Sequence, residues 1–532
     1  MRRSLPRISG RTLGWGVALA SALAGTLGAD LGPVQLPAPP VGPGPAAAIS
    51  CPATGDLHAE LVMSRDELWS FQKQMVDLGP RFTGSPAHKA WLDAIEAELL
   101  ASGLSVERIP HAMPQRWDAT QWSLRLIDGG TEIEVPVASY YPYSGSTPAG
   151  GIVGELVDGG AGLPSDFLLG DFQGKIALVQ EPVAPTTVGE LFYPVLFYQH
   201  DPDLTLTAAT EYKRAWTTIL NPQNSVVTPQ TGTLPAAFAA GAAGVIIALD
   251  LSAENAAGQY TPLWWDALGQ EIPALFVDRN TGAMLAERLA AGGASVRLEL
   301  QAAVVANDSV DELEATLPGT NPGEVIIVNT HSDGPSASEE NGTIGLLAMA
   351  RYFASLPQSC RQRTLVFLFE PGHFHYATHA AQSHDELVSA SVASVTLEHL
   401  GQLEWADDAL GYHPTGLYEP AAIFCSETPI IQLATDAVVG EDLRRVLILR
   451  PYAAYIYFGV GAWLHQAGVP NCSYISGPNQ LLSWADDQHL NKTDPERIKR
   501  EVRAAIRLVS RIDVTAAEVL AAGDTIGMGL LP

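Results

Sequence analysis

The chain has 532 residues, of which 47% are hydrophobic, and its acidic residues outnumber its basic ones by 58 to 30. This length exceeds one ordinary domain and the hydrophobic content is ample for packed cores, so we expect two or three globular units and no disordered protein. The body of the chain has no Lys/Arg cluster that could follow a phosphate backbone, which argues against nucleic acid and anionic membrane surfaces as partners.

The first 24 residues have the pattern of an export signal. Four arginines precede an uncharged apolar stretch, Leu13 to Ala24, that ends in small residues. Cleavage after Ala24 would release a secreted or periplasmic protein with no stable membrane insertion. The alternative is an uncleaved anchor, but the stretch is short for a span of about 20 residues. Residues 25–60, rich in Pro, Gly and Ala over much of their length, are expected to form a linker.

Four cysteines, Cys51, Cys360, Cys425 and Cys472, allow two disulfides in three connectivities in an exported chain. Their spacing is not that of a zinc ribbon. Cys425 and Cys472 follow apolar, strand-like runs and could equally be buried free thiols. Cys51 lies too far beyond the apolar stretch to be a good candidate for lipid attachment.

Hydrophobic periodicity predicts two helices near the start of the folded body, over 64–78 and 87–101. A turn rich in Gly and Pro, residues 79–86, separates them. Two strands are predicted next, over 122–127 and 132–137, because an Asp-Gly-Gly hairpin signal joins them.

The character of the sequence changes near residue 146. The predicted elements are strands over 151–156, 175–180, 245–249, 272–277 and 295–300 and helices over 236–243 and 281–291. A group of short strands with few helices, bounded in this way, indicates an inserted domain over 146–305.

From Asn307 strands and helices alternate, which is typical of a parallel sheet covered by helices. The predicted elements are strands over 324–329, 364–369, 392–397 and 471–475, and helices over 343–353, 382–390, 429–439 and from about 495. Asp494 as N-cap and Pro495 in the first helical position favour the start of the last helix.

Three of these strands run directly into ionisable side chains. The groups are His331 and Asp333, then Glu370 and His373, then Glu398 and His399. Ligands of open parallel α/β sheets bind outside the carboxyl ends of the strands, so these side chains are expected to point into one crevice. The pattern indicates a metal-dependent enzyme or the remains of one.

Each group offers ligands or their supports. His331 and Asp333 lie two apart in an extended segment and face the same side, so Asp333 is placed to hold the second ring nitrogen of a metal-binding His331. Glu339 and Glu340 precede a helix, where a carboxylate can bridge two metals or simply cap the helix. Glu398 or the adjacent histidine would supply a further ligand.

The second strand end is harder to interpret. His373, His375 and His379 all follow it, and a single histidine in an apolar loop is more often packed than bound to a metal. We favour His373 as the ligand because it lies nearest the strand. Glu370 is placed to act as a general base on a metal-bound water.

Five blocks of sequence, in this order, carry a resemblance. They are "LGPRFTGSPAHKAWLDAIEAELLASGLSVE", "VNTHSDGPSASEENGTIGLLAMARYF", "RTLVFLFEPGHFH", "TLEHLG" and "AGVPNCSYISGP". They resemble the zinc exopeptidase family that includes bacterial secreted aminopeptidases, glutamate carboxypeptidase and the transferrin receptor. The middle region, with "GKIALVQ", "AAFAAGAAGVIIALD" and "IPALFVDRNTGAML", resembles the protease-associated domain inserted in many of those proteins.

The resemblance implies an α/β fold. It is a phosphorylase/hydrolase-like three-layer α/β/α exopeptidase domain formed by residues 61–145 and 306–532, with a β-rich protease-associated domain inserted over 146–305. It also implies one or two Zn²⁺ ions and a metal-bound hydroxide that attacks the carbonyl of a peptide or small amide.

By position, four residues match the family's site. His331 matches a zinc-ligand histidine, Asp333 its orienting carboxylate, Glu340 the bridging carboxylate and Glu398 a later acidic ligand. A site of His331, Glu340, His373 and Glu398 would hold at least one ion, because imidazole is a good zinc ligand.

Two departures from the family concern the base and the last ligand. Gly372 and His373 stand where the family has two consecutive glutamates, general base then ligand, so Glu339 or Glu370 would have to replace the base. The last histidine ligand aligns near Trp484, and the candidates that follow are Asp486, Asp487 and His489.

The sequence therefore predicts a secreted, zinc-dependent hydrolase of the aminopeptidase or exopeptidase type. The alternative is a catalytically inactive binding protein on the peptidase scaffold, which the replacement at Gly372 favours. A third possibility is the family relative that cyclises N-terminal glutamine, although the inserted domain argues against it.

Overall fold

The computed structural model describes residues 49–168, 170–183, 186–212, 214, 232–260, 272–373, 384–450, 457–485 and 487–523. The predicted export signal, most of the predicted linker, His375, His379 and Asp486 lie outside the described residues. Among the described helices, none has the length and apolar character needed to cross a membrane.

A mixed sheet forms the centre of the main part. Its strands, in spatial order, are β9 (Ser295–Leu317), β11 (Arg363–Glu370), β10 (Asn321–His331), β12 (Ser391–Leu397), β17 (Asn471–Ser476), β15 (Ala421–Cys425), β16 (Val446–Leu449) and β6 (Leu196–His200). Strands β11, β10, β12 and β17 are parallel, so their carboxyl ends meet at one edge. Most of their residues are buried, as expected where helices cover both faces of a parallel sheet.

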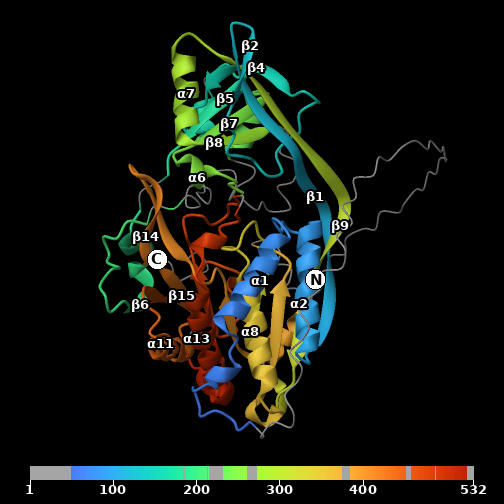
Figure 1. The fold of residues 1–532 in the computed structure, drawn as a ribbon, viewed down its shortest axis with the longest axis vertical. Helices are drawn as coiled ribbons and strands as arrows, with labels where there is room; N and C mark the ends of the chain where they lie inside the picture. The colour runs from blue at the N-terminus through green and yellow to red at the C-terminus, as the bar shows by residue number, and fades with distance from the viewer. Residues whose placement is uncertain are drawn as a thin grey trace, which may run out of the picture. The chain divides into compact units, whose positions relative to one another are not determined.

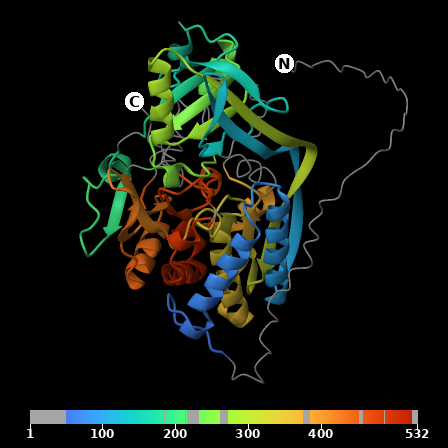
Figure 2. The ribbon, with the colours of Figure 1, turned by 45° about the horizontal axis from the view of Figure 1, so that its top comes forward.

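Helices cover both faces. On one face lie α1 (Arg65–Asp77), α2 (Pro86–Ala101), α8 (Gly342–Ser355), α11 (Ile430–Gly440) and α13 (Pro495–Val514), whose mutual packing can be followed in Figure 1 and Figure 2. On the other lie α10 (Asp385–Ala390) and α12 (Ala462–Gln466). The predicted three-layer α/β/α domain is confirmed.

Local signals explain where two of these helices begin. The Ser64 hydroxyl accepts a hydrogen bond from the Glu67 amide at 3.2 Å while the Glu67 carboxylate accepts one from the Ser64 amide at 2.8 Å, a capping box. Asp494 accepts a hydrogen bond from the Glu496 amide at 2.9 Å, as expected for the N-cap of α13.

The region between β1 and β9 has its own core. Its elements are β1 (Ser105–Asp128), β2 (Thr131–Val135), β3 (Ser139–Tyr140), β4 (Ile152–Asp158), β5 (Ile176–Glu181), β7 (Gly244–Leu249), β8 (Ala274–Val277), α5 (Thr233–Ala239), α6 (Ala253–Ala256) and α7 (Arg279–Ala290). Strands β4, β5, β7 and β8 are parallel neighbours, and their apolar side chains form a cluster separate from that of the main sheet.

Strands β1 and β9 form a long antiparallel ribbon, visible in Figure 1. The pairing runs from Ser105 opposite Thr316 to Ile127 opposite Ser295, with one irregularity near Ala119. The predicted domain boundary at residue 306 therefore falls inside a continuous strand. Cross-strand pairing along the whole length keeps both strands extended where the sequence alone suggested two shorter strands.

One stretch inside 146–305 packs on the main sheet. It contains α3 (Val188–Leu191), the short 3₁₀ helix Tyr193–Val195 and β6, which pairs antiparallel with β16. Its apolar side chains share a cluster with strands β15 and β16. This outer strand had no sequence signal beyond five residues of mixed polarity.

The remaining elements are short. They are the hairpin β13 (Leu403–Asp408) and β14 (Gly411–Tyr418), α14 (Ala517–Leu520) and the 3₁₀ helices Ala59–Leu61, Pro164–Phe167, Gln358–Cys360 and Leu490–Lys492. Disulfides join Cys51 to Cys360 and Cys425 to Cys472. The second pair is formed by residues that face each other on β15 and β17, and the free-thiol alternative for it was wrong.

Candidate metal centre

Three histidines from the three predicted strand ends converge. His331 is the last residue of β10, His373 follows β11, and His399 comes two residues after the end of β12. Each offers a ring nitrogen, and the three nitrogens all lie within 4.8 Å of one another. The ring centroids of His331 and His373 are 3.8 Å apart.

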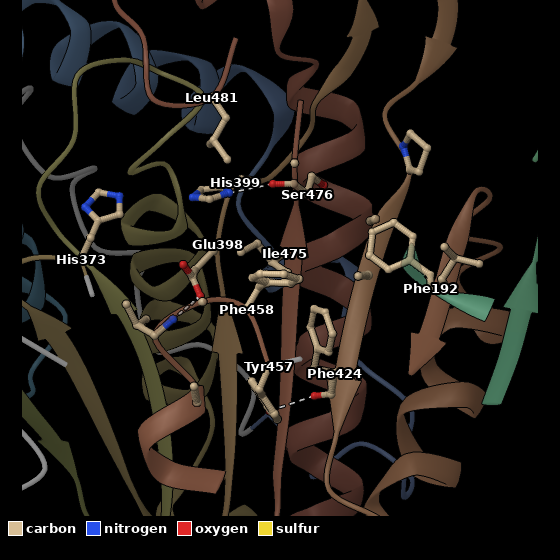
Figure 3. Close-up of a pocket in the computed structure, with 18 of the residues that line it drawn as sticks. Phe192, His373, Glu398, His399, Phe424, Tyr457, Phe458, Ile475, Ser476 and Leu481 are labelled. Carbon is tan, nitrogen blue, oxygen red and sulfur yellow. Dashed lines mark hydrogen bonds between the residues drawn. The ribbon is translucent and has the colours of Figure 1, made fainter. Parts of the chain in front are cut away.

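The tautomers of two of these histidines follow from their hydrogen bonds. His331 Nδ1 lies 2.8 Å from the carbonyl oxygen of Asp333, and His399 Nδ1 lies 2.7 Å from that of Ser476, at the end of β17 (Figure 3). A carbonyl only accepts, so each Nδ1 carries the proton and each Nε2 keeps a lone pair. Both Nε2 atoms are buried without a hydrogen-bond partner, as expected of metal-ligating histidines whose other nitrogen is held by the protein.

Two carboxylates flank the third histidine. His373 Nδ1 lies 2.8 Å from Asp333 Oδ1, and its Nε2 lies 2.6 Å from Glu339 Oε1. Burial disfavours a charged ring, but the two carboxylates outweigh it and raise the pKa of His373 well above its ordinary value. Burial would likewise raise the pKa of Glu339, but His373 outweighs it and lowers that pKa to about 2. The other oxygen of Glu339 accepts the Leu482 amide at 3.0 Å.

Glu398 lies beside the histidines. Its Oε1 accepts a hydrogen bond from the Val460 amide at 2.8 Å, and its Oε2 lies 3.6 Å from His331 Nε2. Gly459 has a φ of +94°, and a Cβ there would lie 2.2 Å from Glu398 Oε1. Only glycine lets the backbone come this close to the carboxylate. Burial raises the pKa of Glu398.

Glu340 points elsewhere. Its carboxylate forms a fully buried ion pair with Arg81, which also donates a hydrogen bond to the Met75 carbonyl at 2.7 Å. Of the two adjacent glutamates, the structure places Glu339 beside the histidines and Glu340 against the turn between α1 and α2.

Glu370 is also engaged away from the histidines. Its Oε1 accepts hydrogen bonds from Asn329 Nδ2 at 2.7 Å and Trp463 Nε1 at 3.1 Å. Burial raises its pKa well above the ordinary value.

His489 lies in a separate hydrogen-bonded group. Its Nε2 is 2.9 Å from Ser483 Oγ and its Nδ1 is 3.0 Å from Lys492 Nζ. The predicted ligands Glu340 and His489 and the predicted base Glu370 are thus outside the histidine cluster.

Sequence reasoning did not assign a role to several groups that hold the site. Thr83 donates a hydrogen bond to Asp333, and Arg81 holds Glu340, although both lie in the recognised turn 79–86. That turn was the available signal. The carbonyl of Ser476 and the amide of Val460 have no sequence signature, because any residue supplies such backbone groups.

A cavity of about 270 Å³ opens beside the histidines. Glu339, His373, Glu398 and His399 line one end. The rest of the lining is uncharged and largely apolar, and Figure 3 shows Phe458, Ile475, Phe424, Tyr457 and, farthest from His373, Phe192. Side chains that can bind a metal thus lie at one end of a cavity that is large enough for an amino-acid side chain.

No protein-family model matches the sequence, and no curated protein matches it. Solved structures match along most of the chain. A zinc aminopeptidase from Bacillus subtilis is 17% identical with a TM-score of 0.56, covering 86% of this chain and 98% of its own. An aminopeptidase from Aneurinibacillus sp. strain AM-1 is 18% identical with a TM-score of 0.53, covering 85% and 95%. A Peptidase M28 precursor from Shewanella amazonensis is 17% identical with a TM-score of 0.60, covering 88% and 100%.

The chain shares the fold of these peptidases. At this identity the likeness concerns the fold, and the chemistry depends on the chain's own residues. Within that fold, three imidazoles with nearby carboxylates are a donor set of the kind that zinc prefers. The two buried Nε2 atoms without partners fit a cation at this place, so the residues present are compatible with zinc.

Proposed function

We propose that this chain is an exported, zinc-dependent hydrolase of the aminopeptidase type. The observation that carries the proposal is the convergence of His331, His373 and His399, with the Nε2 atoms of two of them buried and without hydrogen bonds. A buried polar atom left without a partner is costly unless a ligand satisfies it. The fold shared with two aminopeptidases, one of them a zinc enzyme, supports the same reaction class.

The three histidines, with Glu339, would hold one ion. A zinc ion bound there supplies a Lewis acid that polarises the substrate carbonyl and lowers the pKa of water. Asp333 supports the ligands from outside, because its carbonyl fixes the tautomer of His331 and its carboxylate contacts His373.

Glu398 is the residue that we assign as proton acceptor. It lines the cavity, and Val460 fixes one of its oxygens, while the other lies on the side of His331. Glu339 is less suited because His373 and the Leu482 amide engage one oxygen each. Glu370 does not line the cavity. A general base must reach the water whose proton it takes.

Two further features support the cellular setting and the domain division. Two disulfides favour an oxidising compartment, in agreement with the export signal predicted over 1–24. The parallel strands β4, β5, β7 and β8 have a core of their own, which supports a protease-associated domain within 146–305. Peptides are the proposed partners.

The test is metal content together with hydrolysis. The mature chain, from residue 25, would be produced in an oxidising compartment, its zinc measured by mass spectrometry, and aminoacyl p-nitroanilides assayed with zinc and with a chelator. We expect about one zinc per chain, loss of that zinc in His399→Ala, and retention in His413→Ala, whose side chain is 37% exposed on β14. A wild-type chain that binds no zinc would overturn the proposal.

A second candidate is a metal-binding scaffold without hydrolytic activity. Gly372 occupies the position where the resembling family has its base, and Glu370 is held by Asn329 and Trp463. Stoichiometric zinc with no hydrolysis of any substrate in the panel would favour this candidate over the enzyme.

A further inference from the structure

The apolar end of the cavity is lined in part by a segment that belongs in sequence to the range predicted as an inserted domain. Strand β6 pairs antiparallel with β16, from His200 opposite Val446 to Leu196 opposite Leu449. The residues just before it, from Val188 to Val195, pack their apolar side chains against β15 and β16. The segment thus packs against β15 and β16, the two strands that supply Ala421, Ala422, Phe424 and Leu447 to the cavity lining.

Phe192 is the side chain that this segment places at the cavity. It lines the cavity with only 6% of its surface exposed, and Figure 3 shows it at the opposite end from His373. Its ring meets that of Tyr212 edge to face, with the centroids 5.4 Å apart. This arrangement is favourable for aromatic pairs and fixes the position of the Phe192 ring.

Tyr212 in turn is tied to the main domain. Its hydroxyl donates a hydrogen bond to the Gly477 carbonyl at 3.2 Å, just beyond β17. Two residues later, Arg214 makes a two-pronged contact with the buried Glu419, at 2.9 and 3.0 Å. Such a bidentate pair sets orientation as well as distance. The wall that Phe192 forms is therefore anchored to the main domain twice, through β6 and through residues 212 and 214.

The chemistry of the lining defines what fits. Apart from Glu339, His373, Glu398 and His399, the described residues around the cavity carry no charge. A charged side chain placed among them would lose its hydration without a partner, whereas an aliphatic or aromatic side chain gains from burial.

We propose that Phe192, held by Tyr212, is a specificity-determining residue: it forms the end wall of the pocket for the substrate's side chain and selects large apolar residues next to the scissile bond. This inference rests on the proposed hydrolase. It assigns the end of the specificity pocket to residues 188–214, outside the two ranges expected to form the exopeptidase domain.

The experiment compares kcat/KM for leucyl, phenylalanyl, alanyl, glutamyl and lysyl p-nitroanilides in the wild type, Phe192→Ala and Phe197→Ala. Phe197 is the matched control, because it lies on β6 and packs with Arg450 and the main core outside the cavity. In the wild type we expect kcat/KM for the leucyl substrate to exceed that for the alanyl substrate at least tenfold. It should exceed the values for the glutamyl and lysyl substrates by about a hundredfold. Phe192→Ala should lower the leucyl-to-alanyl ratio of kcat/KM about tenfold.

The outcomes separate the two proposals. Hydrolysis with no preference among the five substrates, an unchanged ratio in Phe192→Ala, or an equal drop in Phe197→Ala would overturn the role of Phe192 and leave the hydrolase standing. No hydrolysis by the wild type would instead count against the hydrolase. If Phe192→Ala fails to fold, Phe192→Leu keeps an apolar wall of smaller volume and should shift the phenylalanyl-to-leucyl ratio upward. No shift in that variant would overturn the inference.

Discussion

Glu339 and Glu398 both reach the candidate metal centre, but the protein engages them differently. Both oxygens of Glu339 have hydrogen-bond partners. In Glu398, Oε1 accepts a hydrogen bond from the Val460 amide, and Oε2 lies 3.6 Å from His331 Nε2. Glu339, with both oxygens hydrogen-bonded, is suited to hold the metal centre in place. Glu398 lines the cavity and is suited to take a proton from water there. We therefore expect Glu398, rather than Glu339, to act as the proton acceptor, and kinetics can test this.

In Glu398→Gln, kcat should fall by a factor of about 10² to 10⁴, because an amide cannot accept the proton while its carbonyl oxygen can still accept the Val460 amide. Zinc content should stay at the wild-type value, since the three histidines are intact. Steady-state kinetics with metal analysis checks both. A variant with wild-type kcat would show that another group takes the proton.

A second residue-level expectation concerns pH and stability. Buried Glu312 lies 2.8 Å from His111 Nε2 and 3.0 Å from His384 Nε2. Burial opposes its charge, but the two histidines outweigh burial and lower the pKa of Glu312. Burial also disfavours charge on His384, yet Glu312 outweighs it and raises the pKa of His384.

These directions fix the sign of the pH dependence. The contribution of Glu312 is present above its ordinary pKa of 4.5 and is lost as pH falls through the lower folded value. That of His384 is present below 6.5 and is lost as pH rises through the higher folded value. The free energy of unfolding should therefore be largest between about pH 4.5 and 6.5. Urea unfolding across pH 4 to 8 should show a flatter profile for Glu312→Gln, and identical profiles would contradict this.

For single residues, the sequence predicted which side chains lie close together but not which way each side chain points. The strand-end pattern placed His331, His373 and His399 together because parallel strands end at one edge. By resemblance the sequence assigned Glu340 as the ligand, whereas Glu339 lies beside the histidines, because Arg81, more than two hundred residues earlier in the chain, holds Glu340.

Among the elements, the segment Gly258 to Tyr260 of the inserted region pairs with the loop that reaches the metal centre. The Trp484 amide donates to the Gly258 carbonyl at 2.9 Å, and the Tyr260 amide donates to the Leu482 carbonyl at 2.7 Å. The amide of the same Leu482 holds Glu339. Backbone hydrogen bonds from the range predicted as an insertion therefore reach the loop that holds a candidate ligand.

Gly258→Ala should disturb this arrangement. A Cβ at Gly258 would lie 1.4 Å from the Trp484 carbonyl oxygen, so the loop must move. Because a shift of about 1 Å can cost a hundredfold in rate, we expect kcat/KM to fall by about that factor and zinc to bind more weakly. Gly174→Ala is the matched control: its φ of +71° resembles the +70° of Gly258, but nothing lies within 4 Å of the new Cβ. Equal effects in both variants would attribute the loss to backbone strain.

The sequence predicted most elements of the sheet and its helices within a few residues, because long buried runs and capped amphipathic helices have clear periodicity. It did not predict β16, a four-residue strand, or β6, whose five residues are half-buried, and it did not predict the length of β1 and β9. These strands extend because of pairing with distant partners, which a local pattern does not contain.

For the molecule as a whole, the disulfide between Cys51 and Cys360 joins the start of the described chain to a turn after α8, across 309 residues of sequence. Closing so long a loop restricts the unfolded chain, so Cys51→Ser with Cys360→Ser should lower the free energy of unfolding by about 2–5 kcal/mol. Urea unfolding monitored by tryptophan fluorescence measures this. An unchanged free energy of unfolding would mean that the disulfide at Cys51 does not stabilise the folded chain.

The placement of β6 has a consequence for the inserted region. Deleting residues 146–305 as though they were a detachable module would remove the partner of β16 and leave that buried, apolar strand as an open edge. Open apolar edges promote pairing between molecules and aggregation. The range 146–305, which the sequence predicted as an inserted domain, therefore cannot be removed without exposing an edge of the main sheet.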